Sequence, residues 1–137
     1  MMLVLIIIRI WIVFVCDLLE TADAPPVNSP SGNYEFRIHE EDTYVQVGVY
    51  DTTGNLLFLD DEKYYKRFRL IVEWQEDDDV LWIYSGDIGT YCIFAENNEW
   101  QELPANAAQI VGKPPRRIAR QLASLRLILT NNEKEHN

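Results

Sequence analysis

The chain has 137 residues, 47% of them hydrophobic, and it carries 12 basic and 22 acidic side chains for a formal net charge of −10. This length allows one domain at most. The acidic balance repels phosphate backbones, which excludes direct nucleic-acid binding and favours a basic protein partner.

The first 24 residues predict a membrane anchor or a signal segment. Residues 1–19 form an apolar run interrupted only by Arg9, Cys16 and Asp17. This run just meets the roughly 17 to 25 residues that a spanning helix needs. Arg9 costs roughly 2.5 to 3.5 kcal/mol near the middle of a span, and the large apolar side chains around it can outweigh that cost. We therefore expect an N-terminal apolar helix that anchors the chain.

Other fates of this segment stay open. Ala22-Asp23-Ala24 has the small-x-small pattern of a signal-peptide cleavage site, with Pro25 directly behind it. Cys16 is a candidate lipidation site, although the preceding Val15 is larger than such sites prefer. A buried helix or strand of a cytosolic protein would also suit the composition of the run.

The charges beside the run predict its orientation. Asp17, Glu20 and Asp23 follow it, and its one basic residue is Arg9. A span with this asymmetry leaves its C-terminal side outside the cytoplasm. We expect a membrane-anchored protein with an extracytoplasmic domain, or, after cleavage, a secreted or periplasmic one.

A Pro- and Ser-rich linker over residues 25–33 leads into one β-rich domain over residues 34–130. Alternating apolar residues between turn signals predict a meander of six or seven antiparallel strands. In the segment 67–74, Phe68, Leu70, Val72 and Trp74 are expected on one face. The predicted strands are 34–38, 43–50, 56–59, 67–74, 80–84, 90–95 and 100–103.

The C-terminal part predicts one amphipathic helix over residues 116–129, after Pro114-Pro115. Ile118, Leu122 and Leu125 share a stripe that could close an open face of the sheet. The arginines at 116, 117 and 120 could instead lie on an anionic membrane. Residues 131–137 are expected to be a disordered tail. The fold class is α+β, with the meander covered by this helix.

Acidic turns are the candidate partner-binding sites. Glu76, Asp77, Asp78 and Asp79 form the densest charge run, in a tight turn between two strands. A calcium loop is disfavoured because the run lacks a bending glycine and a distal glutamate. The set of candidates also includes Asp87, on a glycine-flanked turn, and Tyr84. A solvated turn is the plainer interpretation of each acidic run.

No catalytic, metal or cofactor site is predicted. Cys92 and His39 are a conceivable nucleophile pair with Glu41 orienting the imidazole, but Cys92 alternates within a strand as a small buried hydrophobic residue does. Neither a phosphate-binding loop nor a serine elbow occurs. Two cysteines provide no disulfide framework.

These observations predict a small non-enzymatic envelope protein that binds a protein partner through an acidic, aromatic-rich β-domain. Tyrosine and tryptophan are common in contact patches, which supports a binding role. The alternative is an acidic immunity or inhibitor protein that neutralises a basic toxin, because exposed acidic turns could steer it toward a cationic surface.

Overall fold

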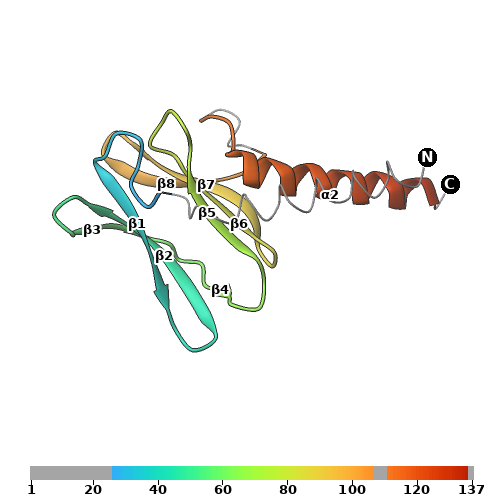
Figure 1. The fold of residues 1–137 in the computed structure, drawn as a ribbon, viewed down its shortest axis with the longest axis horizontal. Helices are drawn as coiled ribbons and strands as arrows, with labels where there is room; N and C mark the ends of the chain where they lie inside the picture. Colours follow the sequence, from blue (N-terminus) through green and yellow to red (C-terminus); the bar gives the residue numbers. More distant parts are fainter. Residues whose placement is uncertain (1–25, 107–110, 136–137) are drawn as a thin grey trace, which may run out of the picture.

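The computed structural model describes residues 26–106 and 111–135. These residues form mostly antiparallel β-structure with one helix near the C-terminus, as the sequence predicts (Figure 1). The N-terminal anchor or signal segment and the candidate lipidation site Cys16 lie outside the described residues. Among the residues that are described, no helix is both long and apolar enough to cross a membrane.

The strands form two four-stranded sheets (Figure 1). Sheet A has the strand order β1-β2-β3, and its fourth strand, β4, pairs with the first residues of β2. Sheet B has the strand order β5-β6-β7-β8. In sheet A the strands are β1 (Tyr34–Glu40), β2 (Tyr44–Asp51), β3 (Leu56–Leu59) and β4 (Tyr64–Tyr65). In sheet B they are β5 (Leu70–Trp74), β6 (Leu81–Ser85), β7 (Gly89–Glu96) and β8 (Glu99–Pro104), followed by helix α2 (Arg116–Glu135).

One face of sheet A packs on one face of sheet B. The strict alternation of Val45, Val47 and Val49 places all three valines on the inner face of β2, where they are buried. Leu81 and Ile83 of β6 face them from sheet B. The members of this core are Phe36, Val45, Val47, Val49, Tyr64, Val72, Trp74, Leu81, Ile83, Tyr91 and Ile93.

The opposite face of sheet B forms a second core with the start of α2. Ile118 is fully buried against Trp82 and Cys92, which point away from sheet A. Burial falls along the helix: Leu122 is half-buried and Leu125 is 44% exposed. Figure 1 shows α2 running away from the strands beyond this contact. The helix thus covers sheet B with its first turns only.

Three features of the expected meander need correction. The described residues contain eight strands, because the short strand Tyr64–Tyr65 also pairs with β2. They form two sheets, because the strands of sheet B are apolar on both faces and need a layer on each side. Strand β5 begins at Leu70, so Phe68 does not point into the core. Phe68 lies in a turn, closed by its N–H donating to the Tyr65 carbonyl at 3.0 Å, and it is 38% exposed.

The helix also extends beyond the expected range, from Arg116 to Glu135 instead of ending at residue 129. The segment Thr130-Asn131-Asn132 contains neither proline nor glycine, and such residues cost only about 0.7 kcal/mol or less each in a helix. The polar residues after 129 therefore continue the helix and do not end it.

Gly112 allows the chain to pass from sheet B to the helix. A Cβ atom at this position would collide with the side-chain amide of Gln75. That amide is held in place, since its Oε1 accepts from Trp82 Nε1 at 3.2 Å and its Nε2 donates to Asp77 Oδ1 at 3.0 Å. Only glycine lets the backbone approach so closely.

We expect Ile118→Ala to lower the free energy of unfolding by about 2–4 kcal/mol, because it empties a fully buried site where α2 packs on sheet B. Urea unfolding measures this loss. Leu125→Ala is the matched control: it changes an exposed leucine of the same helix and should cost less than about 1 kcal/mol. Equal losses in the two variants would contradict the packing described above.

Candidate functional site

The strongest candidate contact surface is a cluster of three rings and one guanidinium, which we name the aromatic patch: Tyr44, Tyr65, Arg67 and Phe68. Tyr44 is half-buried, and the other three side chains are exposed. The rings of Tyr44 and Tyr65 lie with centroids 4.4 Å apart, and Phe68 meets Tyr65 edge-on at 6.4 Å. The guanidinium of Arg67 lies 5.2 Å from the centroid of Tyr65 and 4.8 Å from that of Phe68. These contacts hold large side chains in place at the surface.

Strand pairing explains why the aromatic patch faces outward. Tyr44 pairs with Tyr65 across β2 and β4, while their neighbours Val45 and Tyr64 pair on the inner face and are buried. Tyr65 is 36% exposed. A side-chain hydrogen bond with Tyr65 raises the pKa of Tyr44.

One residue predicted from the sequence joins this patch. Asp87, in the β6–β7 turn, approaches the backbone N–H of Tyr65 with Oδ2 at 3.5 Å. Its other oxygen accepts from the Ser85 hydroxyl. Burial alone would raise the pKa of Asp87, but these hydrogen bonds lower it overall, so the carboxylate is ionised beside the patch. The exposed Ile88 follows it in the same turn.

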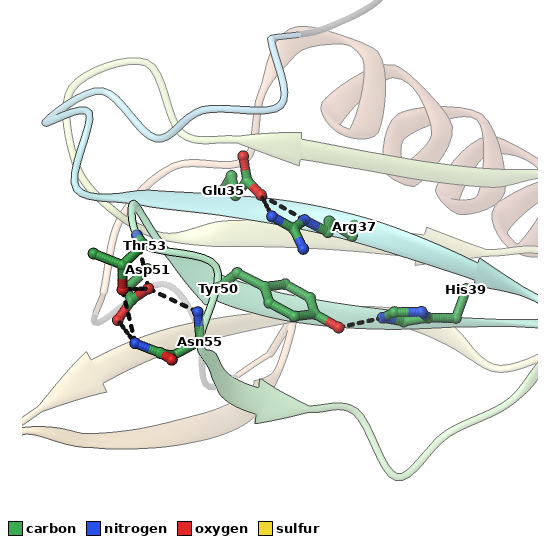
Figure 2. Close-up of polar contacts among 7 residues, drawn as sticks. All are labelled: Glu35, Arg37, His39, Tyr50, Asp51, Thr53 and Asn55. Carbon is green, nitrogen blue, oxygen red and sulfur yellow. Dashed lines mark hydrogen bonds and ion pairs between the residues drawn. The ribbon is translucent and has the colours of Figure 1, made fainter.

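A second row of polar contacts crosses the outer face of sheet A (Figure 2). The Tyr50 hydroxyl lies 2.6 Å from His39 Nε2, and the Arg37 guanidinium lies 4.3 Å from the centroid of the Tyr50 ring. Arg37 also pairs with Glu35. Gly48 makes room for this arrangement, since a Cβ there would lie 3.0 Å from the Tyr50 ring.

The hairpin that follows β2 is stabilised by Asp51 (Figure 2). Its Oδ1 accepts from the backbone N–H of Thr53 at 2.9 Å and of Asn55 at 2.8 Å, and its Oδ2 accepts from Asn55 Nδ2 at 2.9 Å. Side-chain and backbone hydrogen bonds from Asn55, and then those from Thr53, lower the pKa of Asp51 to about 2. Its donors all belong to its own turn, which is a structural role.

The predicted acidic hairpin lies at the other end of sheet B. Asp79 accepts from the Ser31 backbone N–H at 3.1 Å and from the Ser31 hydroxyl at 2.5 Å, so it ties the segment before β1 to this hairpin. Glu76, Asp77 and Asp78 are exposed. Tyr84 is 9% exposed and lies in the second core, three residues along β6 from Leu81 at the start of the strand. The structure therefore separates the six candidates into three places.

The conceivable nucleophile pair is also separated. His39 lies on the outer face of sheet A, whereas Cys92 is fully buried between sheet B and α2. Burial, with the charge of Glu102 as a smaller cause, raises the pKa of the Cys92 thiol to about 11. The thiol is protonated at neutral pH and is a weak nucleophile.

The interior holds one carboxylate of the acidic run Asp60-Asp61-Glu62, so the solvated turn that the sequence favours for this run is wrong for Asp60. Asp60 is fully buried between the sheets and accepts from the hydroxyls of Tyr64 and Tyr91, the latter at 2.6 Å, and from the backbone N–H of Glu62 at 2.9 Å. Tyr64 belongs to sheet A and Tyr91 to sheet B. Asp60 therefore links the two sheets through hydrogen bonds to both.

Burial raises the pKa of Asp60, although its hydrogen bonds oppose the shift. Glu102 lies close enough for its own pKa to be raised by burial and then by the charge of Asp60. The pKa of Glu73 is raised by burial, against the opposing charge of Arg117. Within the described ranges, no three acidic, histidine or cysteine side chains are arranged to hold a metal ion.

The aromatic patch could not be singled out in the sequence, although its residues stand out there as aromatic. Alternation assigned Phe68 to a core strand, and Tyr64-Tyr65 fell between predicted strands. The one available signal was the succession of two tyrosines, two basic residues and a phenylalanine over 64–68. Comparisons with protein-family models, curated proteins and solved structures found no significant match.

The raised carboxyl pKa values give an expected pH dependence. Folded Asp60, Glu73 and Glu102 bind protons more tightly than the unfolded chain, whose carboxyls titrate near about 4. Their contribution to stability is complete below that pH and is lost as the pH rises through the raised values. We expect the free energy of unfolding to fall between pH 4.5 and pH 7, as measured by urea unfolding. Asp60→Asn should flatten this fall, and Asp42→Asn, a control at an exposed residue of the β1–β2 turn, should not.

Proposed function

We propose that this chain is a membrane-tethered, non-enzymatic binding protein that contacts a protein partner through the aromatic patch. The single observation that supports this proposal most is the patch itself. Tyr65 and Phe68 are 36% and 38% exposed although the fold has two apolar cores in which rings can be buried. Exposed tyrosine and arginine in ordered contact are the residue types that supply most of the energy at protein interfaces.

The surroundings of the patch favour this role. Ion pairs lie at its border, with Lys66 Nζ 3.1 Å from Glu40 and Lys63 Nζ 2.8 Å from Glu41. Asp87 lies beside Tyr65. An apolar centre with charged side chains at the rim is the usual anatomy of a protein–protein interface. The ordered rings also reduce the side-chain entropy lost when a partner binds.

The tether is proposed from the sequence. Residues 1–24 carry the apolar run, and the acidic residues behind it favour an extracytoplasmic domain. The described chain begins at Pro26 near Trp74, whose Nε1 donates to the Val27 carbonyl at 2.9 Å. The aromatic patch lies past the opposite end of β5, about 13 Å or more from Trp74 by strand rise. A partner could therefore reach the patch at the end remote from the membrane.

The absence of an enzymatic role is part of the proposal. The separation of His39 from Cys92 and the protonated state of the thiol support it, because nucleophilic catalysis needs both groups within hydrogen-bond reach.

Photo-crosslinking in the cells that make the protein tests the patch. A photoreactive amino acid at Phe68 should yield a discrete covalent adduct with one partner, and the same adduct should form from position 44. A photoreactive amino acid at Leu57 is the control, because this residue is equally exposed at 39% but lies on β3, outside the patch. With the partner identified, Phe68→Ala should weaken binding by tenfold or more (about 1.4 kcal/mol) and Leu57→Ala should not. Identical adducts from positions 68 and 57 would contradict the proposal.

The second candidate function is neutralisation of a basic toxin, and the exposed acidic hairpin specifically favours it. Glu76, Asp77 and Asp78 are exposed within one turn, in a body whose residues 35–102 carry 17 acidic and 5 basic side chains. Such a field accelerates association with a cationic surface and is screened by salt.

This candidate predicts a different response to mutation. Glu76→Gln combined with Asp78→Asn should slow association with a basic partner several-fold at low salt and much less at high salt, because only the steering field changes. Stopped-flow association kinetics measure the effect. Phe68→Ala serves as the comparison: if it leaves affinity unchanged while the double variant slows binding, the acidic hairpin is the contact site and the aromatic patch is not.

A further inference from the structure

Helix α2 begins with an unfavourable arrangement of charge. Arg116, Arg117 and Arg120 lie within its first five residues, and its first turn contains no acidic residue. The N-terminal end of a helix carries partial positive charge, so each arginine there costs stability instead of adding to it. Residues 116–132 contain four arginines and no acidic residue at all. Arginines that oppose the helix dipole do not stabilise the helix, so we look for a binding role for them.

Most of the described part of α2 is not held by the sandwich. Ile118 is fully buried, but one helical repeat later Leu125 is 44% exposed. Figure 1 shows the helix leaving sheet B after its first turns. The apolar stripe of the helix therefore continues beyond the sheet that it was expected to cover.

The helix starts where the chain comes from the proposed membrane anchor. Pro26 and Asn28 line the same hollow as Pro115 and Arg116. The apolar run ends at residue 19, seven residues before Pro26, and an extended chain of that length reaches about 25 Å at most. If residues 1–19 lie in a bilayer, the start of α2 is confined near its surface.

We infer that α2 contacts the anionic lipid surface of the bilayer that holds residues 1–19, through Arg116 and Arg120. This inference rests on the proposed tether. Arg116 and Arg120 are four residues apart and both exposed, so they project from one face of the helix. Arg117 contributes less, since it faces Glu73. The membrane is chosen over a protein partner because the tether holds the start of α2 within about 25 Å of the lipid headgroups.

Charge complementarity supports this occupant. Residues 103–137 carry 6 basic and 2 acidic side chains, whereas residues 35–102 carry a net charge of −12. An anionic surface attracts the first region and repels the second, and both effects act within about 8–10 Å. Glu73 and Glu76 also line the hollow near Arg116 and oppose the attraction there, so Arg120, one turn further along α2, is the stronger of the two contacts.

Hydrogen exchange on the full-length protein in vesicles tests the inference. The vesicles contain phosphatidylcholine alone or phosphatidylcholine with phosphatidylglycerol at 3:1, at low and high salt. We expect amides of residues 116–126 to exchange about tenfold more slowly in the anionic vesicles at low salt, because each arginine near such a surface favours binding about fivefold. High salt should remove the difference.

Two variants with the same charge change make the test specific. Arg116→Gln with Arg120→Gln should abolish the slowing, because it removes both positive charges from this face of the helix. Lys63→Gln with Lys66→Gln is the control, since these lysines lie in exposed ion pairs beside the aromatic patch. The control should keep the slowing. Equal loss in both variants would overturn the inference.

The remaining outcomes separate the inference from the tether. A protein that stays with the vesicles but shows the same α2 exchange in both lipid compositions keeps the tether and loses the inference. A protein that remains free of every vesicle loses both. Slowing that appears without vesicles and grows with protein concentration identifies a second copy of the chain as the occupant, and this also overturns the inference.

Discussion

The burial of β6 on both faces is the constraint on which the rest of the structure depends. All five residues of Leu81–Ser85 are buried, and successive side chains point to opposite sides of sheet B. Leu81 and Ile83 need an apolar layer on one side and Trp82 needs one on the other. Sheet A provides the first layer and the start of α2 provides the second. The three layers (sheet A, sheet B and the start of α2) therefore follow from the burial of every side chain of β6.

The same packing makes the interior costly in one place. Asp60 is buried where the sheets meet, and its carboxylate accepts hydrogen bonds from two tyrosine hydroxyls. Hydrogen bonds from Tyr64 and Tyr91 satisfy the carboxylate in a way that fixes how the two sheets are placed. Because burial still disfavours the charged form of Asp60, the link between the sheets lowers the free energy of unfolding at neutral pH.

Charge and exposure are divided among the ends of the molecule. The acidic hairpin, the start of the described chain and the first turn of α2 lie at one end of sheet B, as the Asp79–Ser31 bonds and the hollow shared by Pro26 and Arg116 require. The aromatic patch lies at the opposite end, beside the β6–β7 turn. This division is what supports a contact surface that points away from a tether.

The sequence by itself determined the antiparallel strands, most of their boundaries and the C-terminal helix, because these follow from local alternation, turn residues and a 3.6-residue period. The valines of β2 are an example, since their alternation already sorted buried from exposed positions. It determined the charge segregation as well. Its predictions about the N-terminal segment stay predictions, because residues 1–25 lie outside the described part of the chain.

Only the tertiary structure decided which face each apolar residue meets. Local periodicity cannot distinguish one covered sheet from two packed sheets, so the layers, the buried Asp60 and the limited docking of Ile118 depended on contacts between distant residues. Phe68 continues the alternation of β5 in the sequence, yet a turn closed onto Tyr65 rotates it out to join Tyr44. The candidate contact surface exists because that turn takes Phe68 out of the strand, and a turn of this kind is decided by the pairing of β4 with β2.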